Sequence, residues 1–161
     1  MKRVEYCTDC GDCTRQAPYF QMLTSEEIDI INKDRFSVRY RAGEMILKQG
    51  THATHVLSLV AGIAKMYIEG IGERNLLLGL ISPWKLIAGP GIHTDNKIHY
   101  SVSALTDTTI CYIDANNFRK IMENNCRFAN QLIKHISERA LGMFELIISL
   151  RDQFQKILQL L

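Results

Sequence analysis

The chain has 161 residues, 47% of them hydrophobic and 22% charged, with a formal net charge of +2. This composition is typical of a globular domain that buries a core, and no apolar run reaches the roughly 18 residues that a membrane span needs. The charged start "MKRVEYC" leads into no apolar stretch, which excludes a secretory signal. We therefore expect a cytoplasmic protein with no membrane partner. A net charge this small, with charges of both signs interspersed, does not by itself make a DNA-binding surface.

The opening segment, residues 1–23, carries three of the five cysteines: Cys7, Cys10 and Cys13. In a reducing cytoplasm, clustered cysteines indicate a metal or redox site rather than disulfides. Thiolates separated by two residues can surround one inorganic centre, and such soft ligands select an iron–sulfur cluster, zinc or copper(I).

Residues 24–125 are predicted to form a mainly β, jelly-roll domain with short flanking helices, which the resemblance described below implies is a sensor domain. Thr24 and Glu27 have the spacing of a capping box, which predicts a helix in "LTSEEIDIINK". Seven short runs rich in β-branched and apolar residues follow, punctuated by glycines: 36–40, 45–49, 55–60, 63–68, 75–81, 100–105 and 108–113. Many short strands with turn residues between them favour a closed barrel, and Asp114 is a good N-cap for a short helix after it.

Residues 126–161 are predicted to form one long dimerisation helix. Its apolar residues step by four and three without a break: Ala129, Ile133, Ile136, Ala140, Met143, Ile147, Leu150, Phe154, Ile157 and Leu161. A seam of this length indicates a coiled coil, and a rod of roughly 50 Å is too long for a small barrel to cover, so we expect a homodimer. A second stripe is expected to pack on the chain's own barrel: Leu132, Phe144, Ile148 and Leu158. Cys126 is expected to be packed at the start of this helix.

Three stretches carry a family resemblance: "RAGEMILKQG", "HVLSLVAGIAKMYI" and "GERNLLLGLISPWKLIA". Together with the order of capped helix, barrel, short helix and long helix, they resemble the sensor half of the CRP/FNR transcription regulators. The resemblance implies a DNA-binding regulator that is not an enzyme, with RNA polymerase as a further partner. The family's helix-turn-helix domain is absent from these residues. We therefore expect either a truncated regulator or a sensor and dimerisation module alone, with DNA contact only through that domain.

The resemblance offers two kinds of effector. For cyclic nucleotides the family uses a glutamate on the ribose and an arginine on the phosphate, and a buried phosphate needs such a charge partner. Residues 75–118 contain neither arginine nor glutamate, and Lys85 and Lys97 are the only cations there. Cyclic AMP is therefore not expected to bind, and we expect no cyclic nucleotide-binding residues.

Members that sense oxygen or nitric oxide hold a 4Fe-4S cluster on three early cysteines and a fourth far down the barrel. The resemblance therefore implies Cys7, Cys10, Cys13 and Cys111 as ligands. The family's second cysteine gap is wider than the one here, so either the ligand set has shifted by one cysteine or the cluster has been lost. Three alternatives stay open: an iron–sulfur cluster, structural zinc on the same thiols, or no metal. In the last case Cys111 is a buried structural residue and a small ligand in the barrel remains a candidate effector.

The histidines suggest two further hypotheses, a haem site and a cupin-type metal site. Some relatives bind haem through a barrel histidine, but His52, His55, His93, His99 and His135 stand in no distinctive motif and are expected to be ordinary surface or satisfied polar residues. A cupin-type metal enzyme would need histidines and a carboxylate that face into the barrel. The segment "HTDNKIH" offers His93, Asp95 and His99, but its flanking Gly-Pro-Gly and Asn-Lys predict a surface loop, and no catalytic residues are expected.

Overall fold

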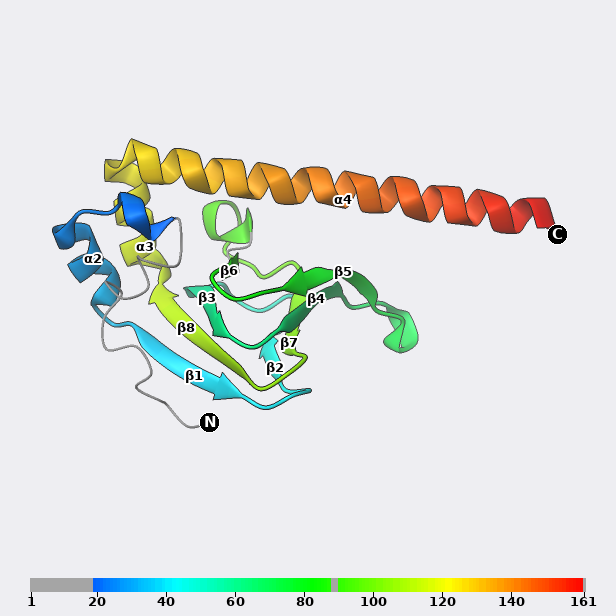
Figure 1. Cartoon of the computed structure of the whole chain (residues 1–161), viewed down its shortest axis with the longest axis horizontal. Helices are drawn as coiled ribbons and strands as arrows, with labels where there is room; N and C mark the ends of the chain where they lie inside the picture. Colours follow the sequence, from blue (N-terminus) through cyan, green and yellow to red (C-terminus); the bar gives the residue numbers. More distant parts are fainter. Residues whose placement is uncertain (1–18, 88–89, 161) are drawn as a thin grey trace.

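The computed structural model describes residues 19–87 and 90–160 (Figure 1). In this part of the chain, eight antiparallel strands form two four-stranded sheets. The first sheet has the order β1 (Phe36–Tyr40), β8 (Thr108–Asp114), β3 (His55–Ala61) and β6 (Leu86–Ile87). The second has the order β2 (Met45–Leu47), β7 (Ser101–Ala104), β4 (Ala64–Ile68) and β5 (Leu76–Ile81). The expected mainly β barrel followed by a long helix is confirmed.

The two sheets enclose an apolar interior. Its buried side chains come from both sheets and include Val38, Leu57, Leu59, Ala64, Met66, Val102 and Ile110. Strand register keeps these residues on one face, because neighbouring side chains along a strand point to opposite faces. Of the strands, only β6 was not predicted: it spans two residues and follows soon after Pro83, so it has no pattern of its own.

Helices cover the outer face of the first sheet. They are the 3-10 helix η1 (Phe20–Met22), α2 (Ser25–Asn32) and α3 (Ala115–Asn124). Both predicted caps are present: Thr24 Oγ1 accepts a hydrogen bond from Glu27 N at 3.3 Å and Glu27 Oε2 accepts one from Thr24 N at 2.9 Å. Asp114 Oδ1 accepts from the first backbone amides of α3. Beneath these helices lies a second core, the helical-side cluster, which includes Phe20, Ile31, Ile113, Phe118, Phe128 and Leu132.

The long helix α4 (Cys126–Leu160) has 35 residues and is attached to the domain through its first turns. Phe128 is fully buried and its ring meets Phe118 of α3 edge to face, with ring centroids 5.3 Å apart. Asn125 supports this junction, because its side chain accepts from Phe128 N and donates to the Met22 carbonyl and the Glu27 carboxylate. The C-terminal end of α4 projects beyond the barrel (Figure 1).

The face of α4 that meets the barrel is not the stripe expected from the sequence. It runs through Phe128, Leu132 and His135, all buried, to the half-buried Arg139. Of the expected stripe, Leu132 is buried, but Phe144 and Ile148 are 59% and 50% exposed, and the side chain of Leu158 lies outside the described residues. The prediction was therefore wrong for these two residues: they lie about half a turn away from the buried face.

Cys126 is exposed, so the expectation that it packs at the start of the helix was also wrong. It occupies the first position of α4, and the chain buries Phe128, two residues later, instead. Residues two apart on a helix point in different directions, so only one of them can enter the junction.

His135 is a buried polar residue on the barrel-facing side of α4. Its Nδ1 hydrogen-bonds to the hydroxyl of Tyr19 at 3.0 Å, and the two rings meet edge to face. Burial and the nearby Arg139 guanidinium hold the pKa of His135 below its usual value. The Leu86 carbonyl and Glu138 act in the opposite direction, and Lys85 adds to the lowering. Nε2 finds no hydrogen-bond partner among the described residues, which is consistent with burial as the dominant effect.

If the junction holds α4 in place, Leu132→Ala lowers the free energy of unfolding by about 2–5 kcal/mol, the usual cost of truncating a buried leucine. Denaturation at one fixed protein concentration measures this, because the stability of an oligomer depends on concentration. Glu145→Ala, at an exposed position of the same helix, is the matched control and changes it little. A loss below about 1 kcal/mol for Leu132→Ala would contradict the packing described.

The second expectation concerns His135 and pH. A histidine whose folded pKa is depressed stabilises the fold while it is neutral, above the unfolded value of about 6.5, and this stability is lost as the pH falls through the lower folded pKa. NMR titration of the His135 ring, assigned by its disappearance in His135→Gln, is therefore expected to give a pKa below about 6.5. A folded-state pKa at or above that value would contradict the buried, cation-flanked environment.

Candidate functional site

Cys111, the expected distant ligand, lies in β8 on the outer face of the first sheet. It is buried, with Ser37 of β1 and Ser58 of β3 as its strand neighbours. Its Sγ lies 3.7 Å from Arg35 Nη1, which donates a hydrogen bond to it. The side chain belongs to the helical-side cluster rather than to the barrel interior.

Cys7, Cys10 and Cys13 lie outside the described residues, so of the four expected ligands the structure reports on Cys111 alone. The first described residues, however, follow Cys13 closely in the chain. Phe20 belongs to the same buried cluster as Cys111. The chain that leaves the cysteine segment is therefore packed on the side of the sheet that carries Cys111.

The mouth of the barrel, between the strands and α4, holds a cation that sequence reasoning missed. Arg139 of α4 places Nη2 2.9 Å from Met66 Sδ of β4 and Nη1 3.5 Å from the Leu86 carbonyl of β6. No carboxylate of the described residues forms an ion pair with it. Barrel cations were expected within residues 75–118, whereas this one comes from the helix. Its spacing from Phe128, Leu132 and His135 is the signal that could have placed it on the barrel-facing side.

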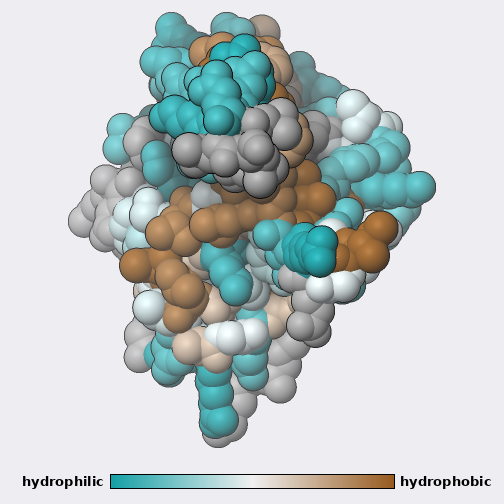
Figure 2. Space-filling view, turned by 90° about the vertical axis from the view of Figure 1, so that its right-hand side faces the viewer, coloured by the Kyte–Doolittle hydropathy of each residue, from teal (hydrophilic) through white to brown (hydrophobic). Residues whose placement is uncertain are grey.

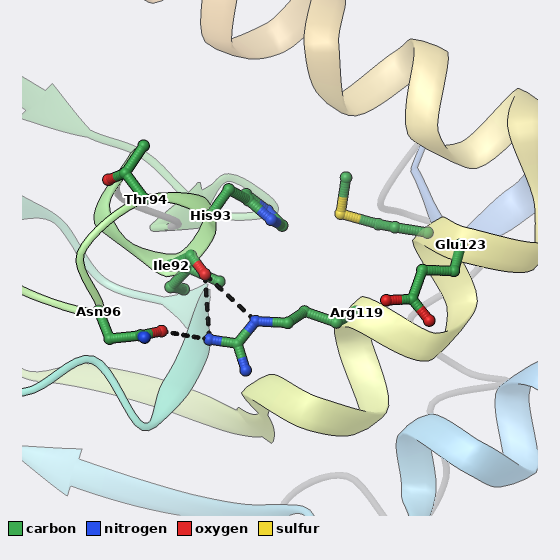
Figure 3. Close-up of a pocket in the computed structure, with 7 residues that line it drawn as sticks. Ile92, His93, Thr94, Asn96, Arg119 and Glu123 are labelled. Atoms are coloured by element: carbon green, nitrogen blue, oxygen red, sulfur yellow. Dashed lines mark hydrogen bonds between the residues drawn. The ribbon is translucent and has the colours of Figure 1, made fainter.

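A hollow of about 460 Å³ lies between α3 and the loop that follows β6 (Figure 3). Arg119 spans it: Nε and Nη2 both donate to the Ile92 carbonyl, at 3.2 and 3.0 Å, and Nη1 donates to Asn116 Oδ1. His93 points into the hollow from the opposite wall (Figure 3), and burial together with Arg119 lowers its pKa. Since all three guanidinium nitrogens are used within the chain, Arg119 acts as a clamp on the loop.

The residues considered for a cupin-type metal are divided between two places. At the surface, Asp95 Oδ1 forms a hydrogen bond with His99 Nε2 at 3.1 Å. His93 instead lines the hollow together with Arg119. In the described ranges, no three histidine, cysteine, aspartate or glutamate side chains are grouped as a metal site would require. The segment is a 3-10 turn and loop, as its sequence predicted. None of the helices described has the length and apolarity for a membrane span.

Comparison with known proteins identifies the family to which this fold belongs. Residues 37–125 match the family described as the cyclic nucleotide-binding domain. The transcriptional activator protein FnrL of Cereibacter sphaeroides is 27% identical over 126 residues, which are 78% of this chain and 50% of FnrL. The chain thus spans about half the length of this curated relative.

Solved structures agree with this assignment at the level of the fold. The sensor domain of the transcriptional regulator DNR from Pseudomonas aeruginosa superposes with a TM-score of 0.71 at 15% identity, over 83% of this chain and 90% of that one. The catabolite activator protein of Thermus thermophilus gives a TM-score of 0.67 at 20% identity, over 83% and 62% of the two chains. The chain belongs to the cyclic nucleotide-binding domain family, and its barrel and long helix share their fold with the sensor domain of DNR and with the catabolite activator protein.

Proposed function

We propose that this chain is the sensor and dimerisation part of a DNA-binding transcription regulator that responds to redox state, oxygen or nitric oxide. In this proposal Cys7, Cys10, Cys13 and Cys111 hold a 4Fe-4S cluster. The supporting observation is that Cys111 lies in one buried cluster with Phe20 and Phe128. That cluster connects the chain after the cysteines, the sheet and the base of the long helix.

The donor set suits an iron–sulfur cluster. Four thiolates are its usual protein ligands, and the first three are separated by two residues each, as in ferredoxin-type runs. Cys111 is shielded from water and receives a hydrogen bond from Arg35, and hydrogen bonds to sulfur are among the groups that tune such clusters. When bound, a cluster of this kind supplies reactivity toward oxygen and nitric oxide.

The chain's own residues provide a route from the cysteines to the dimer helix. Tyr19 forms a hydrogen bond with His135 of α4, and Phe20 packs in the cluster that contains Leu132. Asn125, at the base of α4, holds the Met22 carbonyl. Any change that alters the position of the opening segment therefore acts on the first turns of α4. To be effective, this coupling must favour one state by about 1–3 kcal/mol.

We further propose that α4 forms a homodimer along the heptad seam. Seam side chains in the distal half are exposed in one copy, at Met143, Ile147, Leu150 and Phe154, and Ile133 is exposed nearer the base. Ile136, also a seam position, is partly buried against the chain's own core. The side chain of Ile157 and residue Leu161 lie outside the described residues. Contact with DNA is assigned to a helix-turn-helix domain outside these 161 residues, and RNA polymerase is a further partner of the whole regulator.

Cyclic nucleotides are not part of the proposal, although the family takes its name from them. The barrel segment 75–118 supplies no arginine or glutamate for a cyclic phosphate and its ribose. Lys85 and Lys97 are both exposed at its surface, so neither offers a buried counter-charge.

The cluster proposal predicts a brown protein when the chain is purified without air. We expect iron and sulfide at about four each per chain, the content of one 4Fe-4S cluster, and visible absorbance that bleaches on exposure to air. Cys111→Ala is expected to abolish the absorbance, whereas Cys126→Ala, which removes an exposed cysteine, is expected to retain it. A colourless, iron-free native protein, or a Cys111→Ala variant with full iron content, would end the proposal.

The dimer proposal predicts a two-subunit species in sedimentation velocity. Ile147→Asp places a charge in the seam of each copy and is expected to raise the dissociation constant at least about tenfold, because a carboxylate buried in an apolar contact is strongly disfavoured. Ser149→Asp adds the same charge at an exposed position off the seam and is the control. A native protein that stays monomeric at high concentration refutes the dimer, and an unchanged Ile147→Asp dimer refutes this seam.

A further inference from the structure

A groove of about 610 Å³ lies at the base of α4, between this helix and the segment that leads into α2. One wall consists of residues 21–24, which end η1 and cap α2, and Figure 1 shows η1 beside the base of α4. The other wall is a stripe on α4: Arg127, Asn130, Gln131 and Lys134. These four residues share one face of the helix, because residues three and four apart are neighbours on its surface.

The groove is cationic. Arg127 and Lys134 line it, and none of its described lining residues carries a carboxylate. Among the described residues, Arg127 forms no ion pair, and Lys134 has only a long contact of 3.9 Å with the exposed Glu138. A surface pair of this kind contributes little stability, so Lys134 can exchange Glu138 for another anion. The groove therefore favours a negatively charged occupant.

Three carboxamides accompany the two cations. Gln21 lies on one wall, and Asn130 and Gln131 lie on the other. Their side-chain amides form no hydrogen bond within the described part of the chain. A carboxamide both donates and accepts, as does the peptide backbone, whereas a carboxylate ion by itself only accepts. Free carboxamides on both walls therefore suit an extended peptide better than a small carboxylate.

The two cations determine which peptide fits. Arg127 and Lys134 are seven positions apart in the sequence, which places them about 10 Å apart along the axis of α4. In a polyproline II segment, every third side chain lies on one side, with a spacing of about 9 Å. Acidic residues three positions apart can thus reach both cations at once. Both cations are exposed, so water and salt weaken their hold on a lone anion, and a ligand with several contacts is favoured.

The groove stays open in the proposed homodimer. At 100° per residue, Arg127, Gln131 and Lys134 point roughly opposite the seam positions Ile133 and Ile136. Figure 2 looks toward the C-terminal end of α4 and shows exposed apolar surface on that side of the molecule, whereas the groove lies at the other end of the helix. A second copy along the seam therefore does not occupy the groove.

We propose that this groove binds an acidic, extended peptide segment of a partner protein. Two carboxylates of the peptide pair with Arg127 and Lys134, and the carboxamides bind the backbone between them. Met22 and Leu23, from the opposite wall, offer an apolar contact to the intervening side chains. Asn125, which caps α4, binds the Met22 carbonyl, so a bound peptide contacts the segment that supports the base of α4. This inference goes beyond the proposed function and does not depend on a bound cluster.

The test is fluorescence anisotropy with the full chain and a labelled peptide of the repeat Glu-Ala-Pro, an extended chain with an acid at every third position. Saturable binding is expected. The repeat Gln-Ala-Pro is expected to bind at least about tenfold more weakly, because both cations lose their partners. Inorganic phosphate is expected to displace the peptide no better than chloride at equal ionic strength.

Three results of this titration would overturn the inference. They are an absence of saturable binding, equal binding of the neutral repeat, and displacement by phosphate at a far lower ionic strength than by chloride. The last result would assign the groove to a small anion instead of a peptide.

Charge reversal locates the binding site. Arg127→Glu is expected to weaken binding of the acidic peptide about tenfold, because repulsion replaces attraction. A glutamate in the first turn of a helix is favourable, so this change does not disturb α4. Lys156→Glu makes the same change of charge at an exposed position near the far end of the helix and is expected to bind as the native chain does. An equal loss in the two variants, or no loss in Arg127→Glu, refutes the site.

A peptide of opposite charge gives an independent readout. The repeat Lys-Ala-Pro is expected to bind the double variant Arg127→Glu, Lys134→Glu and not the native chain, since the groove then carries two carboxylates. Circular dichroism checks that the double variant is folded. A folded double variant that does not bind the basic peptide contradicts the proposed charge pairing, and if it does not fold, Arg127→Glu alone decides.

Discussion

The position of α4 depends on one junction between aromatic side chains. Phe118 of α3 and Phe128 of α4 meet edge to face in a fully buried setting, and Phe20 joins the same cluster from the other end of the chain. Everything that α4 does beyond its first turns follows from this anchor, because the distal half of the helix has no support within one copy. The same cluster contains Cys111. In the proposed function, sensing and association therefore depend on the same packed side chains.

The barrel and its helices could be predicted from the sequence because they have local signals. Short apolar runs between glycines mark the strands, and the capping residues Thr24 and Asp114 mark two helix starts. β6 could not be found, since two residues have no periodicity. Heptad spacing predicted the length of α4 but not which face meets the barrel. His135 and Arg139 form part of that face. A prediction based on apolar residues alone leaves them out, although the ring of one and the stem of the other pack in the interface.

The candidate site was predictable in part. The sequence and the family resemblance single out Cys111, and the structure places it beneath the helices rather than inside the barrel. What a sequence cannot give is the convergence of segments far apart in the chain, such as Tyr19 with His135, or Met66 with Arg139. These contacts arise because α4 crosses the open side of the barrel. At this opening the Arg139 guanidinium donates hydrogen bonds to a thioether and a backbone carbonyl of the described residues.

The amide of Asn125 joins the N-terminal ends of two helices, since it caps α4 while it holds the Glu27 carboxylate at the start of α2. From this shared end α4 extends for about 52 Å, so any tilt of the helix about its base is amplified at its tip. A tilt of about 5° at the base would move the tip by roughly 4–5 Å, close to the rise of one helical turn. Sub-ångström rearrangements around the base thus become displacements large enough to change which residues meet at the far end.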